Sequence, residues 1–555
     1  MTYRRLGLSM LAAVVLAAAG SRIAAQNPAA DPCANARDVR LVNGRIATMD
    51  ARNTIASELT IQNGRIVAVG KPAAGRLSAC TREINLRGRT AIPGLVDNHN
   101  HIVLLGIRPG HDTRLETAAS IADVQAMLKA RAARVPAGEF ITAMGGWNRA
   151  QFAEKRLPTL AELDAAAPNH PVLVYESFTG PAATNTRGRT FFTGKGVAVS
   201  DTGAIAGNAP SLAALNALRA AQTFEDQKRG TLEAMAYSAS VGVTTNVDMG
   251  AFIPPGAPDV KDAFTADTLA TADPHRMYDA MSALQRENKL TVRVRVFFLT
   301  MDTSPEFPNL KQRLLNTFRG FGDDMMRLSG VGEFATGWPL FGQPAPTNYT
   351  QALEFIARQG WPFQQHSLSP AEDKLTIDSF EAVNKTIPIA PLHWSIAHAP
   401  RIDAPTIARF KAIGAGIAIH PFTYLAGAPG SGPPIRTILE SGVRAGAGSD
   451  AAQISTLNPW PLIYFMVTGK NAAGQLINDG QQITRLQALR LYTSDNSWFL
   501  NEEQSFGSLE PGRFGDVVVL SEDYFDTAKV PDEAIRRLRS VLTVVGGKVV
   551  HEDMK

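Results

Sequence analysis

Short runs in which apolar and polar residues alternate occur near both ends of the chain. They fill residues 39–93, as in ELTIQNGRIVAVG with its Asn-Gly turn, and return after Gly515 in GDVVVLSEDY and SVLTVVGGKVVHE. Alternation with a period of two is typical of strands that bury one face. The pattern predicts that residues 26–93 and 501–555 build one small β-sandwich domain from both termini.

Between these ends, strand-like runs alternate with helical ones. Such alternation predicts an α/β fold in which helices wrap a parallel sheet. Eight runs fit a (β/α)8 TIM-like barrel over residues 94–500. The eight candidate strands are residues 91–101, 241–250, 291–300, 328–337, 362–367, 392–400, 414–421 and 443–450.

One stretch of the barrel region, residues 106–222, is too long for a single strand-helix unit. It holds the helix-like segment IADVQAMLKARAARV, the segment LPTLAELDAAAP and the polar segment TNTRGRTFFTGKG. We interpret it as a subdomain inserted after the first barrel strand and lying over the barrel mouth.

The first residues have the pattern of a secretory signal peptide, residues 1–25. Arg4 and Arg5 precede an apolar run from Leu8 to Ala19, and small residues follow as far as Ala25. This arrangement predicts a cleaved leader and a periplasmic or secreted mature protein. The apolar run is short for a membrane span, and no later stretch is long and apolar enough to be one, so we expect no span in the mature protein.

Composition is that of an ordinary globular protein, with 45% hydrophobic and 19% charged residues over 555 positions. Removal of the leader, which carries three arginines and no acid, lowers the formal net charge from +4 to +1. Neither the charge nor a basic stripe indicates a nucleic-acid partner, and we expect a small-molecule substrate.

The chain contains two cysteines, Cys33 and Cys80. An oxidising compartment would allow them to pair, and we predict a disulfide between them. Metal ligation is the alternative, but cysteines so far apart lack the paired spacing of a zinc knuckle.

His99 and His101 stand two positions apart at the end of the first candidate barrel strand. Side chains two apart in an extended chain point to the same face, so both imidazoles can reach one metal ion. Taken alone, the pair is equally compatible with ordinary core or surface histidines.

Three further residues strengthen the metal interpretation. His366, His398 and Asp450 stand at or just after the ends of other candidate strands, where barrel enzymes carry their catalytic groups. Imidazole nitrogen and carboxylate oxygen suit zinc, although manganese, iron or nickel accept the same ligands. We expect one or two divalent ions, with zinc preferred.

The motifs IPGLVDNHNH and GSD, the two later histidines, the closing GSLEPGRFGDVVVL and the GGW at residues 145–147 resemble the amidohydrolase superfamily. The resemblance is to its family 3 branch, which includes N-substituted formamide deformylases and relatives of D-aminoacylase, and it spans essentially the whole mature chain. It implies a metal-dependent hydrolase in which Asp450 is both a metal ligand and the general base. In that role Asp450 would take a proton from metal-bound water and pass it to the leaving group.

The sequence departs from this family pattern on the fourth strand. Many relatives carry a lysine there whose carbamate bridges two metal ions, whereas RLSGVGEFATG has none and its one acid is Glu333. We predict Glu333 as the substitute metal ligand. If the lysine corresponds to Gly332 instead, Glu333 would face the opposite side of the sheet and form a structural salt bridge.

A second departure lies in the insertion, where relatives often have Asp-Gly-His and this chain has Phe178-Thr179-Gly180. The difference indicates a more apolar pocket, with Trp147 and Phe178 as candidate lining residues, although buried aromatics are more often core. His420 ends the seventh strand, and we expect it to contact substrate or pack beside the site.

These features favour hydrolysis of an amide-type, non-peptide C–N bond by metal-bound hydroxide. Cleavage of an ester or lactone would use the same residues. Deamination of a nitrogen heterocycle normally needs a glutamate close after the fifth-strand histidine, and Glu372 lies further on. A non-catalytic periplasmic binding protein is a fourth interpretation, and a homodimer is the expected assembly.

Overall fold

The computed structural model describes residues 33–554, apart from residues 34, 73–76, 178–179, 251–275, 341, 343–344 and 452–453. The predicted signal peptide, residues 1–25, therefore lies outside the described residues. None of the described helices is both long enough and apolar enough to cross a membrane.

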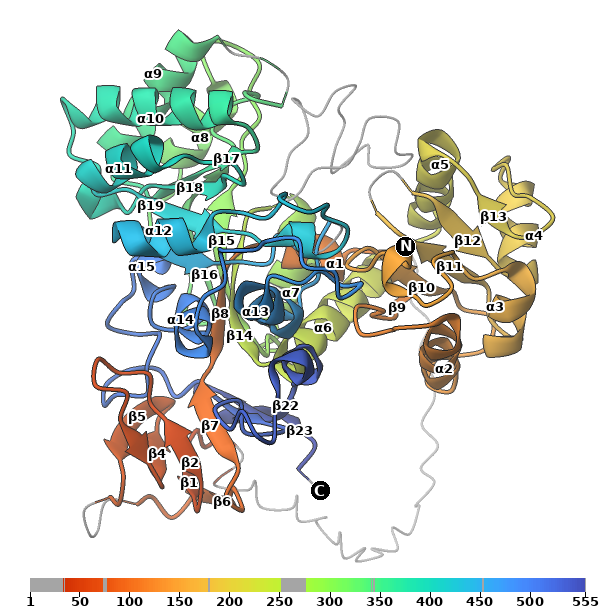
Figure 1. The fold of residues 1–555 in the computed structure, drawn as a ribbon, viewed down its shortest axis with the longest axis horizontal. Coiled ribbons are helices and arrows are strands. Elements are labelled where there is room, and N and C mark those ends of the chain that lie inside the picture. The colour runs from red at the N-terminus through yellow and green to blue at the C-terminus, as the bar shows by residue number, and fades with distance from the viewer. Residues whose placement is uncertain are drawn as a thin grey trace, which may run out of the picture.

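A barrel of parallel strands forms the centre of the molecule (Figure 1). Each of the eight candidate runs overlaps one of its strands, so the predicted α/β barrel fold is confirmed. Most of these strands are buried along nearly their whole length, as expected when helices cover the outside and side chains fill the inside. In their order around the barrel, the described strands are β8 (Leu95–Asn100), β14 (Val243–Asp248), β15 (Arg293–Phe298), β16 (Met326–Glu333), β17 (Phe363–Ser367), β18 (Ser395–His398), β19 (Gly416–Ile419) and β20 (Arg444–Ala447).

One buried asparagine links the first and last strands of the barrel. The side-chain amide of Asn496 donates to the carbonyl of Val96 on β8 at 2.5 Å and to that of Ala447 on β20 at 2.7 Å. Because the edges of β8 and β20 both need partners for their backbone groups, Asn496 helps to close the sheet on itself.

Helices surround the barrel and follow its strands in the chain. Many begin at a side-chain cap, such as Thr223 before α6 and Ser369 before α10. The described helices of this layer are α1 (Ile102–Gly106), α6 (Phe224–Ser240), α7 (Asp279–Arg286), α8 (Pro308–Leu315), α9 (Pro346–Arg358), α10 (Pro370–Asn384), α11 (Ala404–Ala412), α12 (Ile435–Ser441), α13 (Pro459–Thr468), α14 (Arg485–Leu491) and α15 (Ser497–Leu500).

The two termini build a β-sandwich, drawn in red to orange and in dark blue at the bottom of Figure 1. One sheet has the order β5-β4-β1-β6, and the other has the order β23-β22-β21-β7-β2-β3. Apolar side chains from both sheets share one core. The strands among the described residues are β1 (Val39–Val42), β2 (Arg45–Ala47), β3 (Ile55–Ala56), β4 (Leu59–Gln62), β5 (Arg65–Val69), β6 (Arg82–Asn85), β7 (Thr90–Pro93), β21 (Val517–Leu520), β22 (Ser540–Val545) and β23 (Lys548–Glu552).

A disulfide stabilises the sandwich internally, and an ion pair joins it to the barrel. The disulfide predicted between Cys33 and Cys80 is present and joins the segment before β1 to the segment before β6. Arg293 on β15 donates two hydrogen bonds to the carboxylate of Asp516, at 2.7 and 2.9 Å, and both side chains are buried. This ion pair fastens the terminal sheet to the bottom of the barrel.

The insertion forms a separate sheet with the order β13-β12-β11-β10-β9, beside the barrel in Figure 1. Gly146 follows β10 and approaches the loop after the last barrel strand, because a Cβ there would lie 3.2 Å from the carbonyl oxygen of Ser455. The insertion therefore borders that loop. The described elements are β9 (His111–Asp112), α2 (Ile121–Ala132), β10 (Ile141–Met144), α3 (Leu160–Ala166), β11 (Val172–Tyr175), β12 (Ala182–Thr184), α4 (Thr186–Gly194), β13 (Ala204–Ile205) and α5 (Asn208–Arg219).

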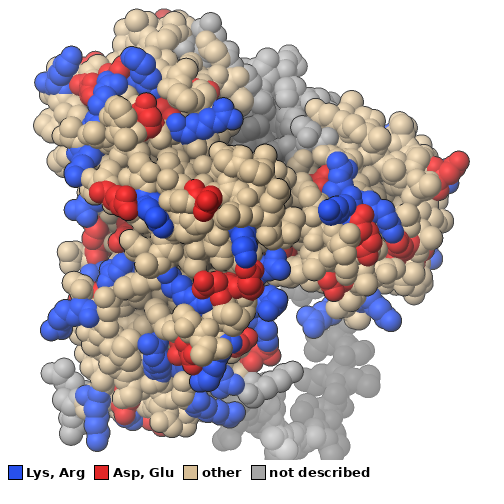
Figure 2. Space-filling view, in the orientation of Figure 1, with Lys and Arg blue, Asp and Glu red and all other residues tan. Residues whose placement is uncertain are grey.

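Basic and acidic side chains intermingle over the surface shown in Figure 2, both on the barrel and on the insertion. Many of them form ion pairs with neighbours, such as Arg409 with Asp378 and Glu381. Mixed charges of this kind fit the near-neutral balance of the chain.

Candidate metal centre

Two imidazoles stand at the end of the first barrel strand, His99 on β8 and His101 just after it. Nδ1 of His99 contacts the side-chain oxygen of Gln364 on β17, and Nδ1 of His101 lies 2.5 Å from the carbonyl oxygen of Gly250. Both partners accept hydrogen bonds, so each histidine carries a proton on Nδ1 and turns Nε2 toward the carboxylates of Glu333 and Asp450. A histidine held by its Nδ1–H in this way has Nε2 oriented for a metal ion.

Glu333 ends β16 and points toward the histidines. Its Oε2 lies 2.6 Å from Nδ1 of His366 and 3.1 Å from Nε2 of His398, while Oε1 lies 3.6 Å from Nε2 of His101. Burial disfavours the carboxylate, but the charge of His366 and the surrounding hydrogen bonds outweigh it and hold the pKa of Glu333 well below its usual range. The carboxylate is ionised and lies between the two pairs of histidines.

His366 and His398 come from neighbouring strands, β17 and β18. Nδ1 of His366 lies 3.0 Å from Nε2 of His398, and the ring of Phe334 stacks on His366 with a centroid distance of 4.9 Å. Burial lowers the pKa of His398, although the nearby carboxylates oppose it. Burial alone would also lower the pKa of His366, but Glu333 beside it raises that pKa.

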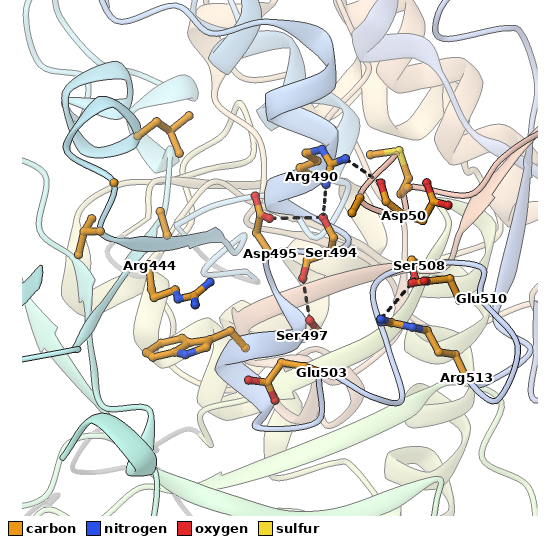
Figure 3. A pocket seen from close by; sticks show the side chains of 17 residues that line it. Asp50, Arg444, Arg490, Ser494, Asp495, Ser497, Glu503, Ser508, Glu510 and Arg513 are labelled. Atoms are coloured by element: carbon orange, nitrogen blue, oxygen red, sulfur yellow. Dashed lines mark hydrogen bonds and ion pairs between the residues drawn. The ribbon is translucent and has the colours of Figure 1, made fainter. Parts of the chain in front are cut away.

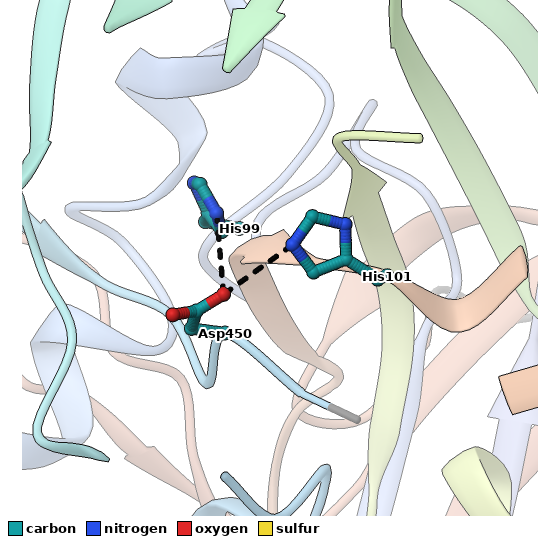
Figure 4. A group of neighbouring side chains, drawn as sticks. All are labelled: His99, His101 and Asp450. Atoms are coloured by element: carbon teal, nitrogen blue, oxygen red, sulfur yellow. Dashed lines mark ion pairs between the residues drawn. The ribbon is translucent and has the colours of Figure 1, made fainter. Parts of the chain in front are cut away.

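Asp450 follows β20 and completes the group (Figure 4). Its Oδ1 lies 3.3 Å from Nε2 of His101 and 3.6 Å from Nε2 of His99, and its Oδ2 lies 3.5 Å from Nδ1 of His398. Burial opposes ionisation, but the nearby imidazoles of His398, His101 and His99 lower the pKa of Asp450 strongly.

Backbone contacts between β8 and the loop after β20 fix this geometry. The amide of Asp450 donates to the carbonyl of His99 at 2.9 Å, and the amide of His101 donates to that of Ala451 at 2.6 Å. The buried carboxylate of Asp97 accepts from the amides of Ser449 at 2.9 Å and His99 at 3.2 Å. Asp97 and Gln364 were not among the residues predicted from the sequence. Gln364 stands two positions before His366 on one strand face, which is a signal that could have found it.

The donor atoms fit a divalent metal centre. Two overlapping groups, His99 with His101 and Asp450, and His99 with Glu333 and His398, each bring one ligand atom per residue within 4.8 Å of the others. Nε2 of His99 is buried and has no hydrogen-bond partner among the described residues. A buried imidazole nitrogen without a partner, surrounded by ionised carboxylates, suits a cation with nitrogen and oxygen ligands.

The remaining predicted site residues lie in different surroundings. Trp147 is 1% exposed, stacks on Phe152 and belongs to the core of the insertion. His420 is also 1% exposed and packs against His99 and His398 with centroid distances of 4.4 and 4.7 Å. Phe178 lies outside the described residues.

A cavity of about 720 Å³ opens at the opposite end of β20 (Figure 3). Arg444, the first residue of β20, lines it, whereas Asp450 lies beyond the last residue of the same strand. Two of its charged groups form an ion pair with each other, Arg513 with Glu510 at 3.0 Å. This cavity is separate from the histidine cluster.

The site residues stand at the carboxyl ends of five barrel strands, and a model of the amidohydrolase family matches residues 82–551. The chain belongs to the amidohydrolase family. The resemblance seen in the sequence is confirmed. The protein is a metal-dependent hydrolase that acts on carbon–nitrogen bonds.

Known proteins resemble this chain along most of its length. It is 23% identical over 549 residues to the N-substituted formamide deformylase of Arthrobacter pascens, covering 93% of this chain and 98% of that protein. An uncharacterized metal-dependent hydrolase from Pyrococcus furiosus superimposes with a TM-score of 0.58 at 20% identity, covering 88% and 100% of the two chains. The atrazine chlorohydrolase of Arthrobacter aurescens TC1, solved in complex with zinc, gives 0.52 at 17% identity, covering 93% and 95%. Identities this low show a shared fold.

Proposed function

We propose that the protein hydrolyses an amide-type, non-peptide C–N bond of a small molecule, with His99, His101, Glu333, His366, His398 and Asp450 holding one or two zinc ions. The observation that carries this proposal is the position of Glu333, whose carboxylate contacts both His366 and His398 and lies within 4 Å of His99 and His101. Bound zinc would activate water and polarise the scissile carbonyl.

Asp450 is the proposed general base. Its carboxylate is ionised and lies next to the Nε2 atoms of His99 and His101, so it can accept a proton from the attacking water. The same carboxyl group can then return the proton to the nitrogen that leaves. The two backbone hydrogen bonds that link β8 to the Asp450 loop keep this oxygen in place during both transfers.

Glu372 supports hydrolysis over deamination. Its carboxylate accepts a hydrogen bond from the amide of Leu368 at 2.6 Å, and Glu372 lies in the first turn of α10. This glutamate therefore stabilises the loop after β17 instead of standing free for the proton transfers that ring deamination requires. A panel of N-substituted formamides, other amides, esters, lactones and amino-heterocycles, assayed with and without a chelator, will separate these reactions.

The metal centre is tested by elemental analysis of the purified protein and of Glu333→Ala. We expect Glu333→Ala to hold less zinc per chain than the wild type and hydrolysis to drop at least 100-fold, because the variant loses the carboxylate between the two histidine pairs. Glu354→Ala on the exposed face of α9 is the control and should keep the zinc content of the wild type. An unchanged metal content in Glu333→Ala would remove Glu333 from the site.

Asp450→Asn tests the general base separately from the fold. The amide keeps the size of the side chain but cannot accept a proton, so we expect kcat to fall by 100-fold or more with little change in the unfolding temperature. Wild-type turnover in this variant would contradict the role given to Asp450.

Other features of the mature protein remain proposals. We propose that residues 1–25 direct export to the periplasm or the medium, which N-terminal sequencing of the exported protein would test. We also propose the division into sandwich halves 26–93 and 501–555, barrel 94–500 and insertion 106–222, together with a homodimer. Limited proteolysis tests the domain division, and light scattering tests the homodimer.

A further inference from the structure

His420 lies beneath the candidate metal centre, at the end of β19. It is 1% exposed, and its ring packs against both His99 and His398. A side chain buried in this way faces other protein groups, so its contribution must pass through the residues that it touches.

Two hydrogen bonds from one residue converge on Nδ1 of His420. The backbone amide of His398 donates to it at 3.1 Å, and Nδ1 of His398 lies 2.8 Å from the same atom. An imidazole nitrogen that accepts from a backbone N–H carries a lone pair and no proton. The proton between the two Nδ1 atoms therefore belongs to His398.

This assignment also determines whether Nε2 of each ring carries a proton. His398 with its proton on Nδ1 has a lone pair on Nε2, and that atom lies 3.1 Å from Glu333 and 3.0 Å from His366. Neutral His420 carries its own proton on Nε2. Which nitrogen of a ligand histidine faces a metal is set by the hydrogen bond that the other nitrogen makes.

The far side of His420 is consistent with a proton on Nε2. A Cβ at Gly448 would lie 2.9 Å from Nε2 of His420 and 2.6 Å from Oδ1 of Asn98, so both atoms border the same small space. Neither has a hydrogen-bond partner among the described residues. A protonated Nε2 of His420 is a donor and Oδ1 of Asn98 is an acceptor. The two atoms are therefore complementary, and they border the space that is open because Gly448 has no side chain.

We propose that His420 is a positioning residue that fixes the Nδ1–H tautomer of His398 and so presents Nε2 of His398 to the metal. The proposal rests on the function proposed above, because it assumes that His398 is a ligand. It assigns His420 neither to the metal nor to the substrate.

Three substitutions separate the two nitrogens of His420. In His420→Asn the side-chain oxygen can take the place of Nδ1, in His420→Gln the amide reaches the place of Nε2, and His420→Phe keeps the ring without either nitrogen. After equilibration at a series of buffered zinc concentrations, we expect zinc affinity at the site that His398 serves to fall 10- to 100-fold in the Gln and Phe variants. The Asn variant should bind within a few-fold of wild type.

The absorption spectrum of the cobalt-substituted protein is a second readout, since it reports ligand geometry without turnover. Near-ultraviolet circular dichroism confirms that each variant folds. Equal zinc affinity in wild type and His420→Phe, or recovery by Gln and not by Asn, would overturn the proposal. Recovery by Gln and not by Asn would mean that His420 acts through Nε2 and not through Nδ1.

Nitrogen NMR of histidine-labelled, metal-free protein keeps this test separate from the proposed function. We expect the Nδ1–H tautomer of His398 in wild type and in His420→Asn, and its loss in His420→Phe. If wild type shows this tautomer but takes up no zinc, the proposed function fails while the hydrogen bond from His398 to His420 stands. If wild-type His398 carries its proton on Nε2, the role of His420 fails by itself.

Discussion

At the residue scale, the geometry of the candidate metal centre depends on hydrogen bonds to the Nδ1 atoms of three histidines, which orient the opposite nitrogen, Nε2, of each ring. His99 has Gln364, His101 has the carbonyl of Gly250, and His398 has His420. These partners come from other strands or from backbone atoms, so spacing along the chain does not reveal them. The ligand candidates themselves were predictable, because each stands at the end of a recognisable strand.

Glu333 shows what the sequence left open at this scale. Its two possible orientations depended on side-chain parity at the end of β16, which a residue count cannot fix where a strand ends irregularly. In the structure its carboxylate points to the histidines and the salt-bridge alternative on the outer face does not apply.

The buried carboxyl group of Asp373 makes a pH-dependent prediction. It lies in the first turn of α10 and accepts a hydrogen bond from Ser367 at 2.5 Å. Burial, opposed by this bond and assisted by the charges of Glu372 and Asp403, raises its pKa to about 6. The unfolded value is about 3.9, so the folded state holds an extra proton between about pH 4 and pH 6, and its stability falls as the pH rises through that window.

Asp373→Asn removes this titration while keeping an acceptor for Ser367. Relative to wild type, we expect the variant to gain about 2 kcal/mol in free energy of unfolding between pH 4 and pH 7.5. Urea unfolding of both proteins at the two pH values measures the difference. A gap that does not change with pH would contradict the raised pKa.

At the scale of elements, the barrel was predictable and the internal sheet of the insertion was not. Barrel strands alternate along the chain with helical segments, which is a strong pattern. The insertion instead builds its sheet from very short strands, and β9 and β13 contain two residues each. Runs this short have no measurable period, so only their pairing in the folded chain defines them.

The disulfide makes a prediction about the sandwich. Cys33 and Cys80 are separated by 47 positions and tie the segments that precede β1 and β6, which are parallel neighbours. Closing a loop of this length restricts the unfolded chain by up to about 4 kcal/mol. The Cys33→Ser/Cys80→Ser variant should lose much of this stability in urea. A reductant should produce the same loss in wild type and none in the variant; equal midpoints for all samples would show that the bond stabilises nothing.

At the scale of the whole molecule, stability depends on the joint between sandwich and barrel. The guanidinium of Arg293 contacts Asp516 and lies 3.8 Å from the ring centre of Phe514, and Asp516 also accepts from the amide of Gly546 at 2.7 Å. Charged groups this buried are tolerated only while they are paired. The joint is therefore sensitive to the loss of one partner.

Asp516→Ala should lower the free energy of unfolding by about 3–5 kcal/mol, because it leaves the charge of Arg293 buried without its partner. The double variant Arg293→Met/Asp516→Leu should recover most of the loss. Glu354→Ala, which breaks an exposed pair with Arg358, should change the value by less than about 1 kcal/mol. A loss in Asp516→Ala no larger than in this control would show that the joint contributes little.

The pairing of β7 with β21 imposes an order on biosynthesis. β7 runs directly into β8 and so into His99 and His101, yet its neighbour in the sheet, β21, leaves the ribosome more than 400 residues later. Until then one edge of β7 has no partner strand. His99 and His101, which follow β7 through β8, therefore lie next to a strand that is paired only with β2. Metal uptake should therefore be among the last events in maturation, following release of the finished chain.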